Sequence, residues 1–150
     1  MRIETLSLQN VGKYLDYLQL ALSLEPEMMT TDIVDEKEIV EALAKESSEV
    51  CKSLLAFEQD QVIGRLEYHF YTCIQDQYKM AYVNWVYVLP AYRHKGVAQY
   101  LFKTFEAICV DNQVNQYFLI RADNEEAEKF YTAFSNVKLS DMPILRKDIN

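Results

Sequence analysis

The sequence is poor in the residues that interrupt or crosslink a chain. Among its 150 residues are three glycines, three prolines and three cysteines. No run of 18 apolar residues occurs, so we expect no membrane span, and the N-terminus lacks the apolar core of a signal peptide, which makes the cytoplasm the expected location. The cysteines (Cys51, Cys73 and Cys109) are odd in number and form no CxxC pair. They indicate reduced thiols rather than a disulfide framework or a zinc site.

Several motifs of familiar catalytic and binding sites are also missing. The phosphate loops GxxxxGK[ST] and GxGxxG do not occur, and neither does HExxH or an acidic calcium loop. The two histidines, His69 and His94, are too few and too dispersed for a metal site, so no metal is expected. We interpret His69 as a hydrogen-bonded structural side chain and His94 as facing solvent. Because no serine nucleophile elbow or catalytic cysteine context is present, a covalent intermediate is not expected.

The composition that remains is that of one folded domain. Half of the residues are apolar, 13% are aromatic and 25% are charged, which excludes a disordered or fibrous protein. The length fits a single domain over residues 1–150. The net charge of −8 repels phosphate backbones, so nucleic acid is not expected as a partner.

Acidic residues are concentrated in the first third of the chain. Nine carboxylates fall in one segment with only two lysines: Glu25, Glu27, Asp32, Asp35, Glu36, Glu38, Glu41, Glu46 and Glu49. This pattern fits a solvated helix face. It also fits an electrostatic funnel that attracts a cationic small molecule.

Hydrophobic periodicity predicts an alternation of strands and helices. The predicted strands cover residues 3–8, 53–58, 61–71, 80–89, 117–122 and 137–145. The predicted helices cover residues 11–24, a segment that begins at Asp35 with a capping-box pattern, and residues 96–111 and 124–134. Antiparallel hairpins lead into a β-α-β crossover, whose two strands must be parallel. The fold class is therefore α+β, with a mixed, mostly antiparallel central sheet and helices on both faces.

The stretch Val86–Ala98 is the most informative for chemistry. A strand runs into a turn with basic residues and a single glycine, and an amphipathic helix follows. Unpaired N–H groups and the positive end of the helix dipole make such a helix start an anion site. Gly96 lets the backbone approach a ligand, and Arg93 and Lys95 add positive charge. A pyrophosphate fits this description, although a plain connecting turn fits it equally well.

This stretch resembles the acyl-CoA signature of the GNAT N-acetyltransferase superfamily, R/Q-x-x-G-x-G/A. The matching residues are Arg93-His94-Lys95-Gly96-Val97-Ala98. A second segment, in which Asn124 is followed by Ala127 and by Phe130-Tyr131, resembles the N-x-x-A-x-x-[FLI]-Y segment of the same family. The family usually has Gly-Phe after this segment, where this chain has Ser135-Asn136. The deduced order of helices and strands is also that of the GNAT fold.

The resemblance implies a role for each matched residue. Backbone groups of Val86, Tyr87 and Val88 would hold the pantetheine arm of acetyl-CoA, where the parallel strands splay apart. The pyrophosphate would lie against the backbone N–H groups of the six-residue turn Arg93, His94, Lys95, Gly96, Val97 and Ala98. Asn124 would contact the co-substrate. Tyr131 would stand near the thioester sulfur and protonate the leaving thiolate, and the alternative is an aromatic side chain that only packs on the sheet.

The general base of the family is missing from its two usual positions. Those positions hold Asn84 and Leu119 here, neither of which is a carboxylate. Glu67 on the neighbouring predicted strand is the best substitute, acting through water, although an exposed strand glutamate is usually only solvated. An acceptor amine could also reach the site already neutral.

The resemblance implies an acetyl-CoA-dependent N-acetyltransferase that works by direct transfer in a ternary complex. Acetyl-CoA is then a co-substrate, and the acceptor is a primary amine of a cationic small molecule or a peptide. The alternative is a non-catalytic acyl-CoA-binding sensor or partner module that lost the base. A homodimer is common among such domains, but no residue of this sequence argues for one.

Overall fold

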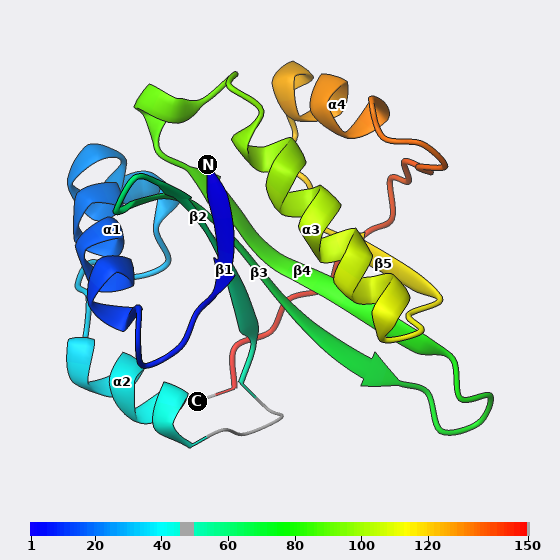
Figure 1. The fold of residues 1–150 in the computed structure, drawn as a ribbon. Helices are drawn as coiled ribbons and strands as arrows, with labels where there is room; N and C mark the ends of the chain where they lie inside the picture. The colour runs from blue at the N-terminus through cyan, green and yellow to red at the C-terminus, as the bar shows by residue number, and fades with distance from the viewer. Residues whose placement is uncertain (46–49, 150) are drawn as a thin grey trace. The chain divides into compact units, whose positions relative to one another are not determined.

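The computed structural model describes residues 1–45 and 50–149, which form two compact units, Met1–Leu119 and Ile120–Asn150. The first unit contains the sheet strands β1 (Arg2–Thr5), β2 (Lys52–Glu58), β3 (Gln61–Thr72), β4 (Lys79–Val88) and β5 (Gln116–Leu119). It also contains helices α1 (Val11–Leu24), α2 (Glu36–Ala44) and α3 (Val97–Asp111), and two short 3-10 helices, Pro26–Met28 and Pro90–Tyr92. Helix α4 (Glu125–Thr132) belongs to the second unit. Figure 1 shows the arrangement of these elements.

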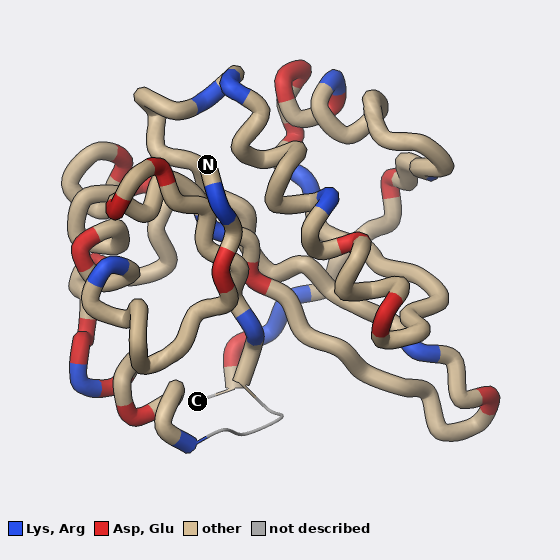
Figure 2. Tube along the Cα trace, viewed as in Figure 1, with Lys and Arg blue, Asp and Glu red and all other residues tan. Residues whose placement is uncertain are grey.

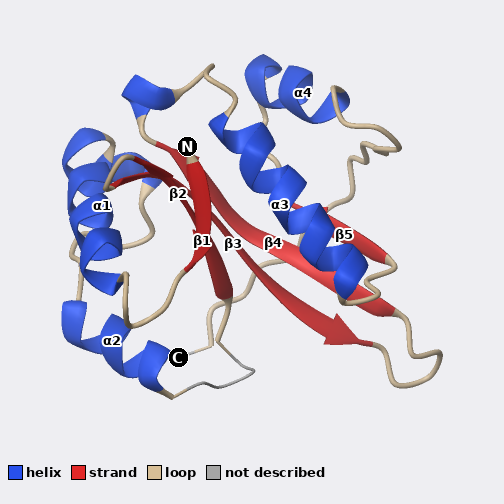
Figure 3. Ribbon diagram, viewed as in Figure 1, coloured by secondary structure: helices blue, strands red, loops and turns tan. Residues whose placement is uncertain are grey.

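The five strands form one mixed sheet in sequence order, as Figure 3 shows. The pairs β1–β2, β2–β3 and β3–β4 are antiparallel, whereas β5 lies parallel to β4. Helix α3 connects these two parallel strands, as a crossover connection must. This topology confirms the predicted α+β class with a mixed, mostly antiparallel sheet.

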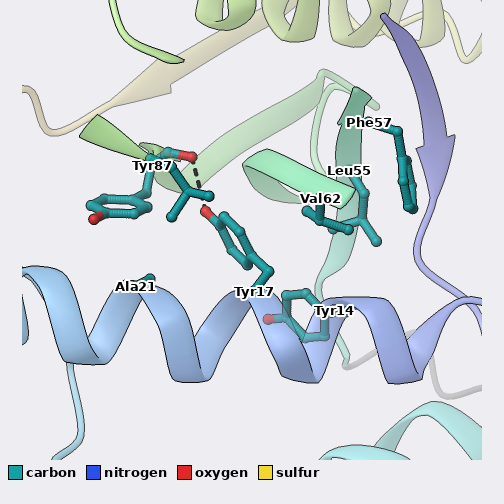
Figure 4. Packing of buried hydrophobic residues seen from close by; sticks show 8 residues of the cluster. Tyr14, Tyr17, Ala21, Leu55, Phe57, Val62 and Tyr87 are labelled. Carbon is teal, nitrogen blue, oxygen red and sulfur yellow. Dashed lines mark hydrogen bonds between the residues drawn. The ribbon is translucent and has the colours of Figure 1, made fainter. Parts of the chain in front are cut away.

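Helix α1 covers one face of the sheet. Tyr14, Tyr17 and Ala21 are spaced at helical intervals and are buried, and they form a core cluster with side chains from the strands. The strand members of this cluster are Leu55, Phe57, Val62, Tyr87 and Leu89. The buried Tyr17 hydroxyl donates a hydrogen bond to the carbonyl oxygen of Tyr87 at 2.9 Å, which Figure 4 draws as a dashed line. Ile39 of α2 packs against the same cluster.

Helix α3 covers the opposite face, toward which the alternate strand residues point. Phe105 of α3 lies 5.0 Å from Tyr68 of β3 between ring centroids. At the start of the helix, Val97 packs directly over Gly64, where a Cβ atom would come within 3.1 Å of Val97 Cγ1. A glycine in β3 thus lets the first turn of α3 approach the sheet closely.

Two of the predicted strands differ from the structure. The segment expected to be a buried strand over 117–122 forms only β5, a four-residue edge strand that is half exposed. Its pairing with β4 ends early because the two strands separate after Val83. The strand expected over 137–145 does not form, and residues 137–149 are exposed without regular structure. Pro143 interrupts this segment, and a proline cannot donate to a strand ladder.

Most of the remaining boundaries agree with the sequence patterns, although the strand expected over 3–8 is Arg2–Thr5 and the helix expected over 124–134 is Glu125–Thr132. Helix α1 begins and ends at the predicted residues, and the carboxylate of Asp35 accepts a hydrogen bond from the backbone N–H of Glu38 at the start of α2. The hairpin between β2 and β3 turns at Gln59, whose φ is +52°. No helix in the described part of the chain is both long and apolar enough to span a bilayer.

Candidate active site

The turn from β4 to α3 presents an uncapped helix start. His94 and Gly96 both have positive φ angles, +58° and +80°, and Gly96 is the N-cap residue of α3. Gly96 has no side chain with which to cap the helix, and the first intrahelical bond joins the Tyr100 N–H to the Gly96 carbonyl at 3.0 Å. The N–H groups of residues 97–99, which precede Tyr100, therefore have no acceptor inside the helix. They point out of its N-terminus toward any anion that binds there.

Space and charge at this turn suit a phosphate. Among the described residues, nothing lies within 4 Å of a Cβ atom placed on Gly96. His94 and Lys95 are exposed, and the Lys95 ammonium lies 5.3 Å from the centroid of the Tyr92 ring. Figure 2 shows blue segments, which mark Lys and Arg, on the loop before α3. A diphosphate could therefore approach the backbone from solvent without displacing a side chain.

The Arg93 side chain turns toward α1. Its guanidinium donates to both carboxylate oxygens of Glu25 and, through Nε, to the carbonyl oxygen of Val88 at 3.0 Å. The Arg93 hydrogen bonds hold the pKa of Glu25 below its usual value. The charge of Arg93, which the sequence assigned to the anion site, is thus engaged by Glu25. The Arg93 backbone N–H is also occupied, because it donates to the Pro90 carbonyl oxygen at 3.2 Å.

Strand β4 continues to Val88 beyond the end of its pairing with β5 and then leads through the 3-10 helix to this turn. Parallel pairing ends at Val83, which is opposite Leu119. The register with β3 skips Asn84, because Glu67 pairs with Trp85 and the next residue of β3, Tyr68, pairs with Val83. Asn84 is therefore a β-bulge in β4, at the point where β5 ends.

The hydrogen-bond alternation of β4 shows which groups face the open edge. The Leu89 N–H donates to the Ile63 carbonyl at 3.0 Å, so this is a hydrogen-bonded pair of the antiparallel ladder. Because such pairs alternate along a ladder, Tyr87 turns its backbone groups toward β3. Val86 and Val88 then turn their N–H and carbonyl groups toward the edge that β5 leaves unpaired. These are two of the three residues expected to hold an extended ligand.

A polar cluster surrounds the bulge on the α1 side of the sheet. The Asn84 amide nitrogen donates to Glu67 Oε1 at 3.3 Å and to Cys51 Sγ at 2.8 Å. His69 Nδ1 lies 3.2 Å from Asn84 Oδ1, and Ser53 donates to Glu67 Oε2 at 3.4 Å. Sequence reasoning found Glu67 but missed its links to His69 and Asn84, because their register follows from the bulge.

A cavity of about 500 Å³ lies between α1, α2 and the same face of the sheet. Its walls are mainly apolar, and its charged members are Asp35, Glu38 and Arg65. The Arg65 side chain is 13% exposed, donates to the Tyr14 hydroxyl and lies 3.7 Å from a Glu67 oxygen. Trp85, the register partner of Glu67, lines the cavity as well. A cavity with few convergent polar groups is typical of a small-molecule site.

The second unit carries the other two predicted site residues. Asn124 is the N-cap of α4, and its side-chain oxygen accepts from the Ala127 N–H at 2.8 Å. The half-buried Tyr131 ring lies among the rings of Phe130 and Phe134, and burial raises the pKa of its hydroxyl. Asn124 therefore has a structural task in this helix, and its contact with a co-substrate stays a prediction, as does the position of Tyr131 at the thioester.

Over residues 1–45 and 50–149, no group of three or more His, Cys, Asp or Glu side chains is arranged to hold a metal ion.

Comparisons with known proteins agree with this geometry. The model of the acetyltransferase (GNAT) family matches residues 17–135. No curated protein sequence matches the chain.

Solved structures of low sequence identity share the fold. One is an aminoglycoside acetyltransferase from an uncultured soil metagenomic sample, solved with trehalose, with a TM-score of 0.83, 15% identity and coverage of 99% of this chain and 96% of that one. Another is a ribosomal-protein-alanine N-acetyltransferase from Brucella melitensis biovar Abortus 2308, with a TM-score of 0.73, 15% identity and coverage of 97% and 99%. The family match spans most of the strand–turn–helix site and of the sheet that supports it, and on this ground the chain belongs to the acetyltransferase (GNAT) family.

Proposed function

We propose that this protein is an acetyl-CoA-dependent N-acetyltransferase that transfers the acetyl group to a primary amine. The observation that carries the proposal is the separation of β4 from β5 beside the uncapped start of α3. An open strand edge that leads to a helix N-terminus suits a long ligand with an amide-rich arm and a diphosphate. Acetyl-CoA has both parts.

The residues of this segment fit such a ligand. The backbone groups of Val86 and the N–H of Val88 would hydrogen-bond the amides of the arm as a missing strand would, since the Val88 carbonyl already accepts from Arg93. The N–H groups from Gly96 to Ala98 would bind the diphosphate, with Lys95 contributing charge. In the proposed reaction, the amine nitrogen attacks the thioester carbonyl, and the N–H of Val86 stabilises the negative charge that develops on the oxygen.

Protons move at two places in this reaction. The amine loses a proton as the C–N bond forms, and we propose that Glu67 takes part in its removal. The thiolate of CoA gains a proton as the C–S bond breaks, and we assign that donation to Tyr131, whose pKa lies above that of an ordinary tyrosine. Both steps follow direct attack in a ternary complex.

The acceptor would bind in the cavity between α1 and α2. Asp35 and Glu38 on its walls favour a cationic amine. One structural neighbour is an aminoglycoside acetyltransferase, which supports a polyamine or an amino sugar as acceptor. Cationic amines are expected to be acetylated faster than neutral or acidic amines at low salt. Faster acetylation of neutral or acidic amines would refute this acceptor class.

We also propose a cytoplasmic location, and a homodimer stays a prediction.

A non-catalytic acyl-CoA-binding module is the second candidate. It is favoured by the absence of a carboxylate at Asn84 and Leu119, the two positions that hold the base in relatives. Release of free thiol from acetyl-CoA in the presence of an amine, reduced strongly by Tyr131→Phe, would decide for the enzyme. If the protein binds acetyl-CoA but no tested amine causes thiol release, the result would decide for the non-catalytic module.

Calorimetric titration with acetyl-CoA tests the co-substrate site. We expect micromolar binding that is lost in Gly96→Trp, because the indole would fill the space in front of the helix start. Gly96→Ala reports the cost of a side chain at a positive φ without the bulk. Gly12→Trp, at an open position on α1, controls for the added tryptophan and should bind normally. Equal binding by Gly96→Trp would place the co-substrate elsewhere.

A further inference from the structure

We propose that His69 Nε2 accepts the proton of the acceptor amine and that Glu67 and Asn84 are positioning residues for it. This inference rests on the proposed acetyltransferase function and assigns its missing base. It starts from the hydrogen-bond chain Glu67–Asn84–His69 at the bulge of β4.

Glu67 sets the orientation of the Asn84 amide. An ionised carboxylate only accepts hydrogen bonds, so the Asn84 atom that faces Glu67 Oε1 at 3.3 Å must be the donor, Nδ2. Arg65 Nη1 lies 3.7 Å from the other Glu67 oxygen and forms an ion pair with the carboxylate. The Asn84 oxygen, Oδ1, therefore points the opposite way, toward His69.

Asn84 in turn sets the tautomer of His69. An amide oxygen cannot donate, so the contact of 3.2 Å between His69 Nδ1 and Asn84 Oδ1 requires the proton on Nδ1. In a neutral imidazole, a proton on one nitrogen leaves a lone pair on the other. His69 Nε2 therefore carries the basic lone pair, as a general base requires.

The surroundings of His69 suit this role. The ring is held by Tyr82, 5.7 Å away between centroids, and by Tyr71, 6.1 Å away. Other titratable groups facing it are Glu67, through Asn84, and Cys51, whose Sγ lies 3.9 Å from Nδ1. Burial raises the pKa of Cys51, and the Glu67 charge adds to the effect, so Cys51 stays a neutral thiol. Within residues 1–45 and 50–149, the hydrogen-bond contacts of the His69 ring are made by Nδ1 and none by Nε2.

The cluster also lies where an amine would arrive. Asn84 marks the end of the β4–β5 pairing, and Trp85 beside it lines the cavity between α1 and α2. The proposal places the reacting amine between this cavity and the open edge of β4, beside the bulge, so that its proton passes to His69 directly or through one water. As the C–N bond forms and the C–S bond breaks, one amine proton passes to Nε2 and then to solvent, while the thiolate is protonated separately.

Kinetics test the assignment with acetyl-CoA and three probe amines: spermidine, sisomicin and a peptide with a free N-terminus. His69→Asn is the decisive variant, because its amide N–H can replace Nδ1–H toward Asn84 while the basic nitrogen is removed. We expect kcat to fall about 100-fold or more with acetyl-CoA affinity unchanged. If His69 is the base, the fall of kcat/KM toward acid pH that its protonation would cause should be absent from this variant.

Two further variants distinguish the general base from the residues that only position it. Tyr71→Phe, which keeps the ring next to His69, should retain the rate and the pH profile. Glu67→Gln should lower the rate but keep the acidic limb, because His69 is still present. If Glu67→Gln abolishes the limb and His69→Asn keeps it, Glu67 is the base and the proposal is wrong. Absence of thiol release from the unmodified protein with every probe amine refutes the proposed function itself, and His69 then has no such role.

Nitrogen NMR of the histidine ring gives a readout that needs no acceptor. At pH 8 we expect the 15N signals of His69 to show the Nδ1–H tautomer, with Nε2 unprotonated. In Glu67→Gln the Asn84 amide is released to rotate, so the fraction of the other tautomer should rise. An Nε2–H tautomer in the unmodified protein would overturn the proposal.

Discussion

Arg93, in the turn before α3, donates to both carboxylate oxygens of Glu25 at the end of α1, although the two residues are 68 positions apart. The Tyr87 hydroxyl donates to the same carboxylate at 2.7 Å. Burial, together with the bond to Glu25, raises the pKa of Tyr87 to about 12, so this donor stays protonated at physiological pH. The turn proposed to bind acetyl-CoA is thereby fixed to the helix that forms one wall of the acceptor cavity.

Glu25→Gln should destabilise the protein, by about 1 kcal/mol for a partly exposed charged pair. The pKa of Glu25 is lowered in the folded state, so its stabilisation is present above the unfolded-state pKa of about 4.3. It is lost as the pH falls through the folded-state pKa. Urea unfolding should be measured from pH 7 to 3. The difference in unfolding free energy between the wild type and the variant should become smaller as the pH falls. Glu27→Gln, exposed and two residues away, is the control, and a pH-independent difference would contradict the prediction.

Gly64→Val should disturb the start of α3. The new side chain would meet Val97 Cγ1 and Val88 Cγ2, which lie 3.1 and 3.3 Å from a Cβ at this position. We expect a loss of about 1–3 kcal/mol in unfolding free energy and weaker acetyl-CoA binding by calorimetry. Gly12→Val adds the same group in open space on α1 and should change neither quantity much. An unaltered acetyl-CoA affinity in a destabilised Gly64→Val protein would show that the first turn of α3 does not bind the co-substrate.

Substitution of Asn124 can separate its two tasks. Asn124→Ala removes the N-cap of α4 and should cost about 1 kcal/mol of stability. Asn124→Asp keeps an acceptor oxygen for the Ala127 N–H and should preserve stability. If the Asn124 amide N–H contacts acetyl-CoA, calorimetry should show weaker binding in both variants. Full affinity in Asn124→Asp would restrict Asn124 to capping.

Tyr131→Phe tests the proposed thiolate protonation. We expect kcat to fall about 100-fold, while acetyl-CoA binding is retained because only a hydroxyl is removed. Since burial raises the pKa of Tyr131, the wild-type rate should hold up to a pH above the ordinary tyrosine value of about 10. Tyr78→Phe, on the exposed β3–β4 loop, is the matched control. A rate that is unchanged in Tyr131→Phe assigns the proton to another donor.

The sequence predicted most of the fold because the relevant signals are local. The spacing of Tyr14, Leu18 and Leu22 places α1, and Asp35 with Glu38 places the start of α2. The strand expected over 137–145 rested on weak alternation, and a strand needs a neighbouring edge that no local pattern reveals.

The site was predictable only in part. The turn up to Ala98 carries a local motif, so the positive φ of Gly96 agrees with what the motif requires. The side-chain direction of Arg93 depends on Glu25, far away in the sequence. Likewise, the bulge at Asn84 depends on how β4 pairs with β3, and this register brings Glu67, His69 and Asn84 together. Long-range register and charge pairing have no signature in a short stretch of residues.

The early end of the β4–β5 ladder also has a consequence for how the protein must be handled. Beyond Val83, β4 has no pairing with β5 in the described part of the chain, and its groups on that side, apart from the Val88 carbonyl that accepts from Arg93, lie next to valine and tyrosine side chains. Such an edge is the type of surface on which a second strand can dock and start aggregation. A ligand that lies along this edge would cover it and bond its backbone groups, as a neighbouring strand would. Protein kept without acetyl-CoA should therefore precipitate sooner on storage or mild heating than protein saturated with it, and the choice of purification buffer becomes a matter of colloidal stability.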